Sequence, residues 1–136
     1  MSSHDRVTVR EVMSSTLYVV EGLASVREAI EIMAEHRVSS LVVDRRDEHD
    51  EYGLIVVNDI AEQVIGPNRA PDRTSVYEVM SKPVLTLEGE MDIKYAIRLL
   101  ARFGISRALV LEHRDLVGIV TLRDLVLRYV SATART

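Results

Sequence analysis

A threonine and an aspartate three residues apart stand where an apolar stretch gives way to a helical pattern. Thr121 and Asp124 follow the β-branched pair Ile119 and Val120, and helix-type spacing of apolar residues begins at Leu122. A strand that turns directly into a helix leaves backbone N–H groups without partners, and hydroxyl and carboxylate oxygens can accept from them. The same groups could instead bind a ligand hydroxyl or an anion.

This arrangement occurs twice in the chain. The segment 53–59 repeats the segment 118–124, with Gly and Asp in the same relation, at an offset of 65 residues. Glu11-Val12-Met13 likewise matches Glu78-Val79-Met80, at an offset of 67. The offset drops between Asp44 and Gly53, so the first copy has a longer loop there. The chain is therefore predicted to hold two homologous modules of about sixty residues.

Each copy contains the elements needed to position such a turn. Each copy begins with a leader that carries a capping box, at Thr8 to Glu11 in the first copy and at Ser75 to Glu78 in the second. A β-rich run follows the leader, and then an amphipathic helix begins, at Ser25 in the first copy and at Asp92 in the second. Apolar runs after these helices are too hydrophobic to face water and are predicted to be sheet centres. The expected ranges are 17–20, 25–37 and 39–43 in the first copy and 84–87, 92–104 and 106–111 in the second.

The order of these segments resembles a tandem pair of CBS domains, the module named after cystathionine β-synthase. The resemblance covers roughly residues 9 to 131 and rests on the double occurrence of the Val-Met leader and the strand-to-helix motif. It implies an α/β fold in which two pseudo-symmetric β-α-β-β-α repeats pack as one module. The predicted boundaries are 7–66 for the first repeat, 67–73 for a Gly/Pro-rich linker, 74–131 for the second repeat and 132–136 for a frayed tail.

The resemblance also implies that an adenosyl ligand binds in clefts between the two repeats. In the family the Asp that opens the last helix binds the ribose hydroxyls, the Ser or Thr before it assists, and strand residues of the other repeat enclose the base. An ionised carboxylate accepts two vicinal hydroxyls, which would favour ribose over deoxyribose. Carried onto this chain, the stronger site comprises Thr121, Arg123 and Asp124 with Tyr18, Val38, Ser39 and Ser40.

The mirror site departs from the family pattern. Val56 stands where the second copy has Thr121, so one hydroxyl contact is lost. The loss of one such contact weakens a site by about 1 kcal/mol, so this cleft is expected to be weaker or empty. The implied residues are Asn58 and Asp59 with Leu85, Ile105, Ser106 and Arg107.

A reading without ligands stays open for both turns. Thr121 and Asp124 also form an ordinary capping box, and Asn58 could cap the first helix in place of Val56. Phosphates would need cations, for which Arg37, Arg107 and Arg123 are the nearest candidates. Arg123 could equally lie on a solvated helix face. In this rival hypothesis the chain is a ligand-free dimerisation or scaffold module.

The amino-acid composition excludes several classes of function. The chain of 136 residues has a net charge of −4, one Phe, no Trp and no Cys. It therefore lacks the basic and aromatic footprint of a nucleic-acid binder and cannot form thiolate metal sites or disulfides. The four His, at 4, 36, 49 and 113, have no metal-ligand spacing, although magnesium could accompany ATP. No nucleophile elbow, phosphate-binding loop or Cys nucleophile is present, so an enzyme is not expected.

The predicted function is regulatory sensing of AMP, ADP, ATP, NAD or S-adenosylmethionine, read out by an unidentified partner protein. No resident cofactor is expected. The resemblance implies a homodimer, and apolar helix residues such as Ile60, Val64, Leu125 and Tyr129 are expected to need covering. The first residues hold no apolar run, and no apolar segment reaches 18 residues, which predicts a cytoplasmic protein without membrane contact.

Overall fold

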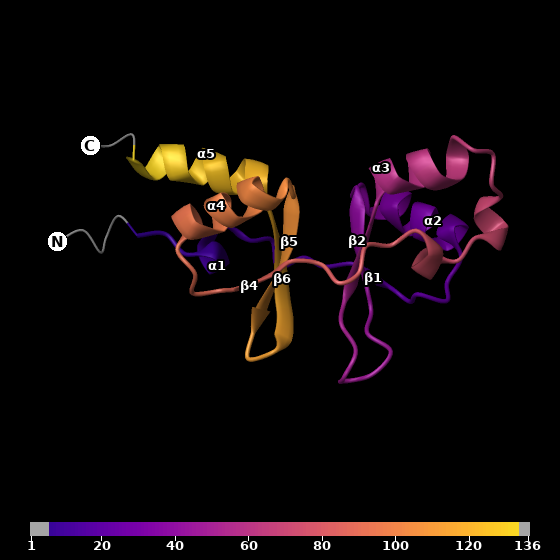
Figure 1. The fold of residues 1–136 in the computed structure, drawn as a ribbon, viewed down its shortest axis with the longest axis horizontal. Coiled ribbons are helices and arrows are strands. Elements are labelled where there is room, and N and C mark those ends of the chain that lie inside the picture. The colour runs from indigo at the N-terminus through magenta and orange to yellow at the C-terminus, as the bar shows by residue number, and fades with distance from the viewer. Residues whose placement is uncertain (1–5, 134–136) are drawn as a thin grey trace. The chain divides into compact units, whose positions relative to one another are not determined.

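The computed structural model describes residues 6–133, so His4 and residues 134–136 of the predicted tail lie outside it. The chain forms two compact units (Figure 1). The first-repeat unit comprises Leu17–Val84. The second-repeat unit combines the leader up to Thr16 with the chain from Leu85 onward. Each unit therefore contains one repeat together with the leader that precedes the other repeat.

The first-repeat unit is built on a three-stranded sheet in the order β1-β2-β3. β1 and β2 are parallel, whereas β2 and β3 form an antiparallel hairpin. The last helix starts as an α-helix and continues without a break as a π-helix, a form that the sequence did not indicate. The elements are β1 (Val19–Val20), α2 (Val26–His36), β2 (Ser40–Val43), β3 (Gly53–Val56), α3 (Val57–Ile60), the π-helix η2 (Ala61–Ile65), and the 3-10 turns η3 (Pro71–Arg73) and η4 (Val76–Glu78).

The second-repeat unit has the same topology, with a sheet in the order β4-β5-β6. β4 is parallel to β5, and β5 is antiparallel to β6. The prediction of an α/β fold with two β-α-β-β-α repeats is confirmed, and β2 and β5 are the predicted central strands. The elements are α1 (Val9–Val12), β4 (Thr86–Glu88), α4 (Ile93–Phe103), β5 (Arg107–Glu112), β6 (Asp115–Thr121) and α5 (Leu122–Thr133).

The ends of the amphipathic helices follow the predicted caps. The Ser25 hydroxyl accepts the Glu28 N–H at 3.1 Å, and the Asp92 carboxylate accepts the Lys94 N–H at 2.9 Å. Both helices end in a left-handed residue, Arg37 with φ 56° in α2 and Gly104 with φ 64° in α4. Because glycine has no Cβ, it adopts this conformation without strain, whereas arginine does not.

Each leader completes the sheet of the other repeat. Ser14 exchanges backbone hydrogen bonds with Ile119, at 2.8 and 3.0 Å, and Ser81 does so with Leu54, at 3.0 and 2.8 Å. A Cβ on Gly118 would lie 2.9 Å from the Ser14 carbonyl oxygen. The repeated glycine of the motif therefore lets a leader cross the last strand of the sheet at close range.

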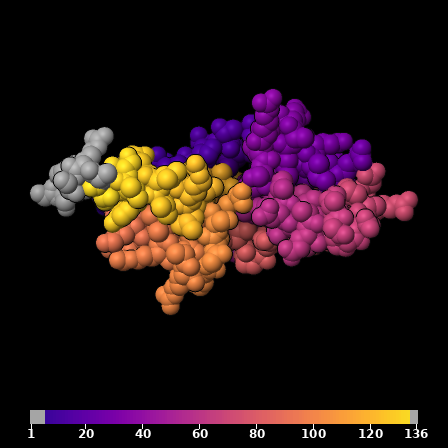
Figure 2. Space-filling view, turned by 90° about the horizontal axis from the view of Figure 1, so that it is seen from above, coloured from indigo at the N-terminus to yellow at the C-terminus, as the bar shows by residue number. Residues whose placement is uncertain are grey.

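Each unit has its own hydrophobic core between sheet and helices. Val26, Ala29 and Met33 of α2 line the first core, as expected for the predicted amphipathic helix. Ile60, Val64 and Leu125 are at most 4% exposed and belong to these cores, so the prediction that they need an external partner is wrong. In the last helix of each repeat, the large apolar residues that remain exposed are Val57 and Ile65 in the first-repeat unit and Val126, Leu127 and Val130 in the second. Figure 2 shows α5 at the surface of its unit.

Residues 131–133 were expected in or next to a frayed tail, but they form the last turn of α5. The Thr133 hydroxyl donates to the Tyr129 carbonyl oxygen at 3.0 Å, which satisfies its polar group within the helix.

Candidate functional site

The turn from β6 into α5 holds the predicted acceptors of the second-repeat unit. The Thr121 hydroxyl accepts the Asp124 N–H at 3.1 Å, so it caps the helix. The Leu122 N–H donates to the Ser106 carbonyl oxygen at 2.9 Å. Thr121 also pairs with Arg107 in the β5–β6 register. The turn is therefore held by backbone and hydroxyl groups, without using the Asp124 side chain.

The Asp124 carboxylate remains available at this helix start. Its side chain is 52% exposed, and its recorded contact among residues 6–133 is with Arg123, whose Nη1 lies 3.4 Å from Oδ1. In the leaders, by contrast, Glu11 and Glu78 reach back to accept the backbone N–H of Thr8 and Ser75, which completes both capping boxes. The Asp124 carboxylate makes no such reciprocal bond. It can accept from a ligand without any loss of capping.

Three further predicted residues of this unit lead into the strands β4 and β5. Leu85 precedes β4, and its carbonyl oxygen accepts the Leu109 N–H at 3.0 Å. Ile105 and Ser106 connect α4 to Arg107 at the start of β5. The Arg123 side chain is 79% exposed, so it lies on the solvated helix face that was considered as the alternative to phosphate binding.

The first-repeat unit holds the residues expected around a base. Tyr18 precedes β1, and its ring stacks on His36 with a centroid distance of 3.9 Å and an interplanar angle of 16°. Val38 and Ser39 lead into β2, which begins at Ser40, and the Ser39 carbonyl oxygen accepts the Val57 N–H at 2.9 Å. Sequence reasoning did not find the stacked His36, because nothing in its spacing indicates that contact.

The mirror turn from β3 into α3 lacks a side-chain cap. Val56 is the N-cap residue, with extended backbone at φ −124° and ψ 153°. Asn58 lies inside the first helical turn, so the expectation that it replaces Val56 as cap is wrong. Within residues 6–133 neither the Asn58 nor the Asp59 side chain has a recorded hydrogen bond or ion pair.

The predicted site residues thus fall into two sets, one in each unit. The structure brings together Thr121, Arg123 and Asp124 with the chain around Ser106, and separately Tyr18 and residues 38–40 with residues 56–59. The stronger and weaker sites each combine residues from both units, so the two clefts themselves stay a prediction.

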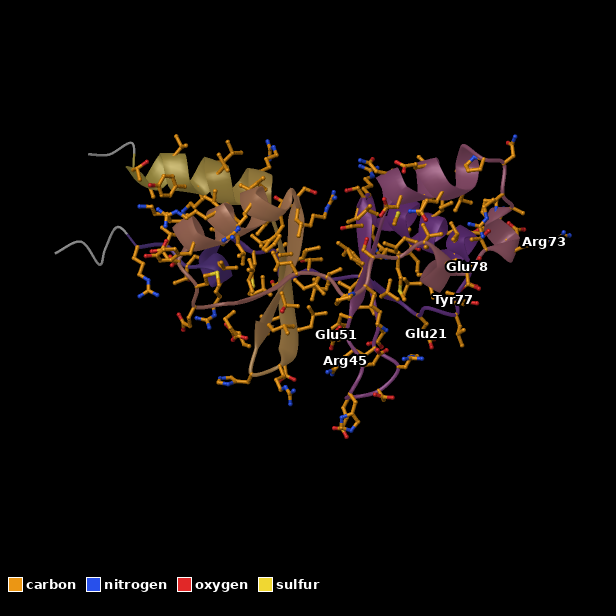
Figure 3. All side chains as sticks on the ribbon, viewed as in Figure 1. Glu21, Arg45, Glu51, Arg73, Tyr77 and Glu78 are labelled. Carbon is orange, nitrogen blue, oxygen red and sulfur yellow. The ribbon has the colours of Figure 1, made fainter. Side chains whose placement is uncertain are left out.

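A cavity that was not predicted lies within the first-repeat unit. It has a volume of about 670 Å³ and opens beyond the carboxyl ends of the parallel strands β1 and β2. Figure 3 shows Glu21, Arg45 and Tyr77 on the hairpin side of this unit. The lining residues are Glu21, Gly22, Leu23, Val43, Asp44, Arg45, Arg46, Tyr77, Met80 and Lys82.

One carboxylate fixes two of the cavity's three cations. Asp50 Oδ2 lies 2.8 Å from Lys82 Nζ and 3.1 Å from Arg46 Nε. The Lys82 hydrogen bond, followed by the Arg46 backbone N–H, holds the pKa of Asp50 well below its usual range. Arg45 has no recorded ion pair in the described part of the chain, and its guanidinium lies 4.7 Å from the centroid of the Tyr52 ring.

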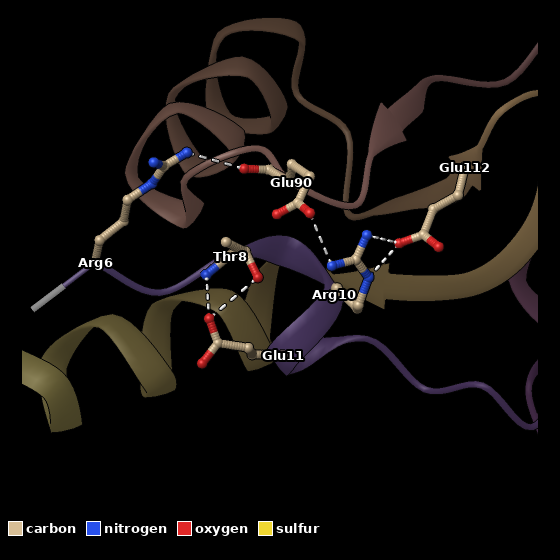
Figure 4. Close-up of polar contacts among 6 residues, drawn as sticks. All are labelled: Arg6, Thr8, Arg10, Glu11, Glu90 and Glu112. Carbon is tan, nitrogen blue, oxygen red and sulfur yellow. Dashed lines mark hydrogen bonds and ion pairs between the residues drawn. The ribbon is translucent and has the colours of Figure 1, made fainter. Parts of the chain in front are cut away.

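The corresponding place in the second-repeat unit is closed by ion pairs (Figure 4). Arg10 binds Glu112 and also Glu90, whose Oε2 lies 3.0 Å from Nη1. A Cβ on Gly89 would lie 2.5 Å from the Glu112 carboxylate. The hydrogen bond to Glu90, followed by that to Glu112, raises the pKa of Arg10 above its usual value.

Comparison of the two copies in the sequence could have revealed this difference. Arg10, Glu90 and Glu112 stand at the positions that Tyr77, Leu23 and Arg45 occupy in the other copy. The charged triad of one unit is therefore absent from the other.

No group of three His, Asp or Glu side chains in residues 6–133 is arranged to hold a metal ion. None of the helices in the same range is both long and apolar enough to cross a membrane.

Comparisons with known proteins identify the repeat. The family profile of the CBS domain matches residues 9–66 and 76–131. An uncharacterized protein of Methanopyrus kandleri is 35% identical over 103 residues, which are 72% of this chain and 52% of the relative. A second relative, a 33.4 kDa protein of Thermofilum pendens, is 29% identical over 90% of this chain and 43% of its own length. The chain thus spans about half of these curated relatives.

Solved structures share the same fold. A hexameric CBS-CP12 protein from bloom-forming cyanobacteria has a TM-score of 0.87 and 30% identity, over 92% of this chain and 69% of that one. The CBS domain pair of protein MJ0100, in complex with 5′-methylthioadenosine and S-adenosyl-L-methionine, has a TM-score of 0.77 and 24% identity, over 93% of this chain and 98% of that one. With matches that cover both repeats, this chain belongs to the CBS domain family.

Proposed function

We propose that this chain is a regulatory module that binds an adenosyl ligand between its two repeats and signals to a partner protein through a conformational or oligomeric change. The observation that carries the proposal is the exposed Asp124 carboxylate at a helix start that is already capped by Thr121. A carboxylate that served only as a cap would accept a backbone N–H, as Glu11 and Glu78 do. The adenosyl complex of the MJ0100 pair supports the ligand class.

Each group of this turn has a distinct role in the proposal. Asp124 accepts hydrogen bonds from the two ribose hydroxyls, and these bonds are strengthened by the negative charge of the carboxylate. Arg123 and Arg107 supply cations for the phosphate groups of a nucleotide or for the carboxylate of S-adenosylmethionine. Tyr18 and residues 38–40 of the other repeat contact the base. Magnesium would accompany the ligand only if the ligand is ATP.

The two clefts are expected to differ in affinity. The stronger one uses the Thr121 turn, whereas the weaker one uses Asn58 and Asp59 with residues 85 and 105–107. At the mirror turn Val56 cannot supply a hydroxyl, which corresponds to a loss of about 1 kcal/mol in ligand binding. The module would therefore respond to one ligand at low concentration and fill its second cleft only at higher concentration.

Homodimerisation is the proposed output. Val57 and Ile65 are 43% and 53% exposed, and they border a mostly apolar groove between α2 and the last helix of the first-repeat unit. In the second-repeat unit Val130, the equivalent of Ile65, is exposed, and so is Val126 one helical turn before it. Apolar faces of this kind are covered in isologous dimers. We propose a cytoplasmic, non-enzymatic dimer that regulates a separate protein or a further domain.

One observation favours the rival scaffold function. Thr121 is engaged as a helix cap, so its type at this position is explained without a ligand. In that hypothesis the module dimerises and holds a partner, and neither aspartate binds a nucleotide.

A thermal-shift panel decides between the two functions. The purified chain is heated with AMP, ADP, ATP, NAD, S-adenosylmethionine and 2′-deoxy-AMP, beside an Asp124→Asn variant. A ligand at 100 times its dissociation constant stabilises the folded state by about 2.7 kcal/mol, which raises the melting temperature by several degrees. Sensing predicts a shift with ribonucleotides that is absent with 2′-deoxy-AMP and in the variant. No shift with any compound at millimolar concentration would favour the scaffold.

A further inference from the structure

The cavity of the first-repeat unit lies apart from the residues assigned to the adenosyl clefts. Its lining includes none of them, and it opens at the ends of β1 and β2 where the chain leaves the sheet. In α/β folds, ligands bind in the crevice beyond the carboxyl ends of parallel strands. A volume of about 670 Å³ is within the range of small-molecule sites.

In the second-repeat unit, charged side chains occupy the equivalent place. Above Gly89, the carboxylate of Glu112 and the guanidinium of Arg10 fill the space, at 2.5 and 3.3 Å from the position of a Cβ. Above Gly22, the nearest atoms are the Cβ of Tyr77 at 3.6 Å and Val43 Cγ1 at 3.8 Å, both at the distances of ordinary packing. The chain itself supplies an anion and its cation in one unit and leaves the place open in the other.

The chemistry of the open site is mixed. Leu23 is 84% exposed and Tyr77 53% exposed, and with Met80 they give an apolar wall. Arg45, another lining residue, stands at the position of Glu112 and has no recorded ion pair among residues 6–133. The acidic Glu21 and Asp44 also line the cavity, and Asp44 Oδ1 accepts the backbone N–H of Arg45 at 2.8 Å.

These charges restrict the kind of anion that fits. Asp50 shares its charge between Lys82 and Arg46, so the cavity has no broad positive field. A polyanion would meet Glu21 and Asp44. A single anionic group, placed at Arg45, avoids that repulsion and gains a charge-assisted hydrogen bond.

We infer that this cavity binds a small amphipathic anion, with a flat or branched apolar body against Leu23, Tyr77 and Met80 and one carboxylate or phosphate group at Arg45. The ligand takes the place of the Arg10 and Glu112 side chains of the other unit. This site is independent of the adenosyl cleft, since it uses neither Asp124 nor Asp59.

Three naphthalene probes test the inference by their head groups. 2-Naphthoate, 2-naphthyl phosphate and the neutral 2-naphthamide are titrated into the full ¹⁵N-labelled chain, and amide shifts are followed by two-dimensional NMR. Saturable shifts are expected at Gly22, Leu23 and Tyr77 with the anions, and binding of the amide is expected to be at least about tenfold weaker. The better of the two anions identifies the head group.

Variants separate this site from the alternatives. Arg45→Gln should remove the preference for anions, whereas Asp124→Asn should leave all naphthoate shifts unchanged. The triple variant Leu23→Glu, Arg45→Glu, Tyr77→Arg rebuilds the triad of the other unit and should abolish binding. Leu23→Glu alone, at a highly exposed position, should weaken binding severalfold and keeps the test valid if the triple variant does not fold. Shifts confined to other residues, equal binding of the amide, or no binding at about 5 mM would overturn the inference.

Discussion

The two repeat units share a backbone and differ in the side chains placed on it. The Val9 N–H donates to the Met91 carbonyl oxygen at 2.8 Å, and the Val76 N–H donates to that of Ala24 at the same distance. These four residues are repeat equivalents at an offset of 67. The strand-to-helix turns and the crossed leaders correspond as well, whereas the β2–β3 loop is longer than the β5–β6 loop and the last helix of the first-repeat unit continues as a π-helix.

Three of the differences between the side chains on this common backbone bear on a cap, a helix end or a cavity. Thr121 is matched by Val56, Gly104 by Arg37, and the Arg10 triad by the open cavity at Tyr77. The backbone equivalence is explained by hydrogen bonds that any residue type can form. The divergent side chains therefore mark where the two units differ locally.

The largest effect is expected from substitutions at the glycines where a leader crosses the last strand of a sheet. Gly118→Ala should lower the free energy of unfolding by about 3 kcal/mol, because its Cβ meets the Ser14 carbonyl oxygen and the side chain of Met13. Gly53→Ala should cost only about 1 kcal/mol, since its closest neighbour is the flexible end of Met80 at 2.9 Å. Urea unfolding measures both. Equal losses would show that the two crossings are equally tight.

The second comparison concerns the helix caps. Thr121→Val removes the hydroxyl that accepts the Asp124 N–H and should cost about 1 kcal/mol in unfolding free energy. Val56→Thr should recover part of the same amount in the other unit, because Val56 already has the extended backbone of an N-cap residue. Denaturant midpoints of the single and double variants check additivity. A stabilising Thr121→Val would contradict the assignment of the cap.

The third comparison exchanges the left-handed residues. Arg37→Gly should stabilise the chain by about 0.5–1 kcal/mol, since relief of strain exceeds the entropy that glycine adds to the unfolded chain. Gly104→Ala should cost about 1 kcal/mol through φ alone, because no atom lies within 4 Å of its Cβ position. Thermal unfolding of both variants tests the pair. A destabilising Arg37→Gly would mean that the arginine side chain makes a contribution of its own.

The smallest expected effect is the pH dependence of stability that Asp50 gives to the β2–β3 hairpin. The pKa of Asp50 lies below its ordinary value of 3.8, so the ionised group stabilises the fold above that pH. Asp50→Asn should therefore lower the urea midpoint at pH 7 and at pH 5. The gap from wild type should shrink as the pH falls below about 4. Glu48→Gln, at an exposed position on the same hairpin, is the matched control. A gap that widens in acid would contradict this origin.

Local features of the fold could be predicted because their signals are local. The capping boxes at Thr8 and Ser75 and the caps at Ser25 and Asp92 need only neighbouring residues, and the structure contains all four. The crossing of the leaders could not be predicted. Both sheets offer the same glycine, and sequence order does not tell which of them a leader completes.

Predictions about exposure were less successful for a physical reason. Helical periodicity shows that a helix has an apolar face but not what that face packs against. Ile60 and Leu125 therefore looked available for a partner, although they lie in the cores. The π-helix of residues 61–65 also shifts the register of the last turn, which no residue type in that stretch signals.

The open cavity could have been found, but only by comparing the copies position by position. Arg10 and Tyr77 are unremarkable surface residues when each is considered alone. Their equivalence, together with that of Glu90 and Leu23, is the signal.

Isothermal titration of the adenosyl compound that gives the largest thermal shift tests the central claim most directly. It is titrated into the wild type, Asp124→Asn and Asp59→Asn, with the 2′-deoxy analogue as control. The proposal predicts one tighter site that is lost in Asp124→Asn, reduced with the deoxy analogue and retained in Asp59→Asn. Tight binding that survives in Asp124→Asn, or that disappears only in Asp59→Asn, would contradict the assignment of the Thr121 turn as the principal ligand site.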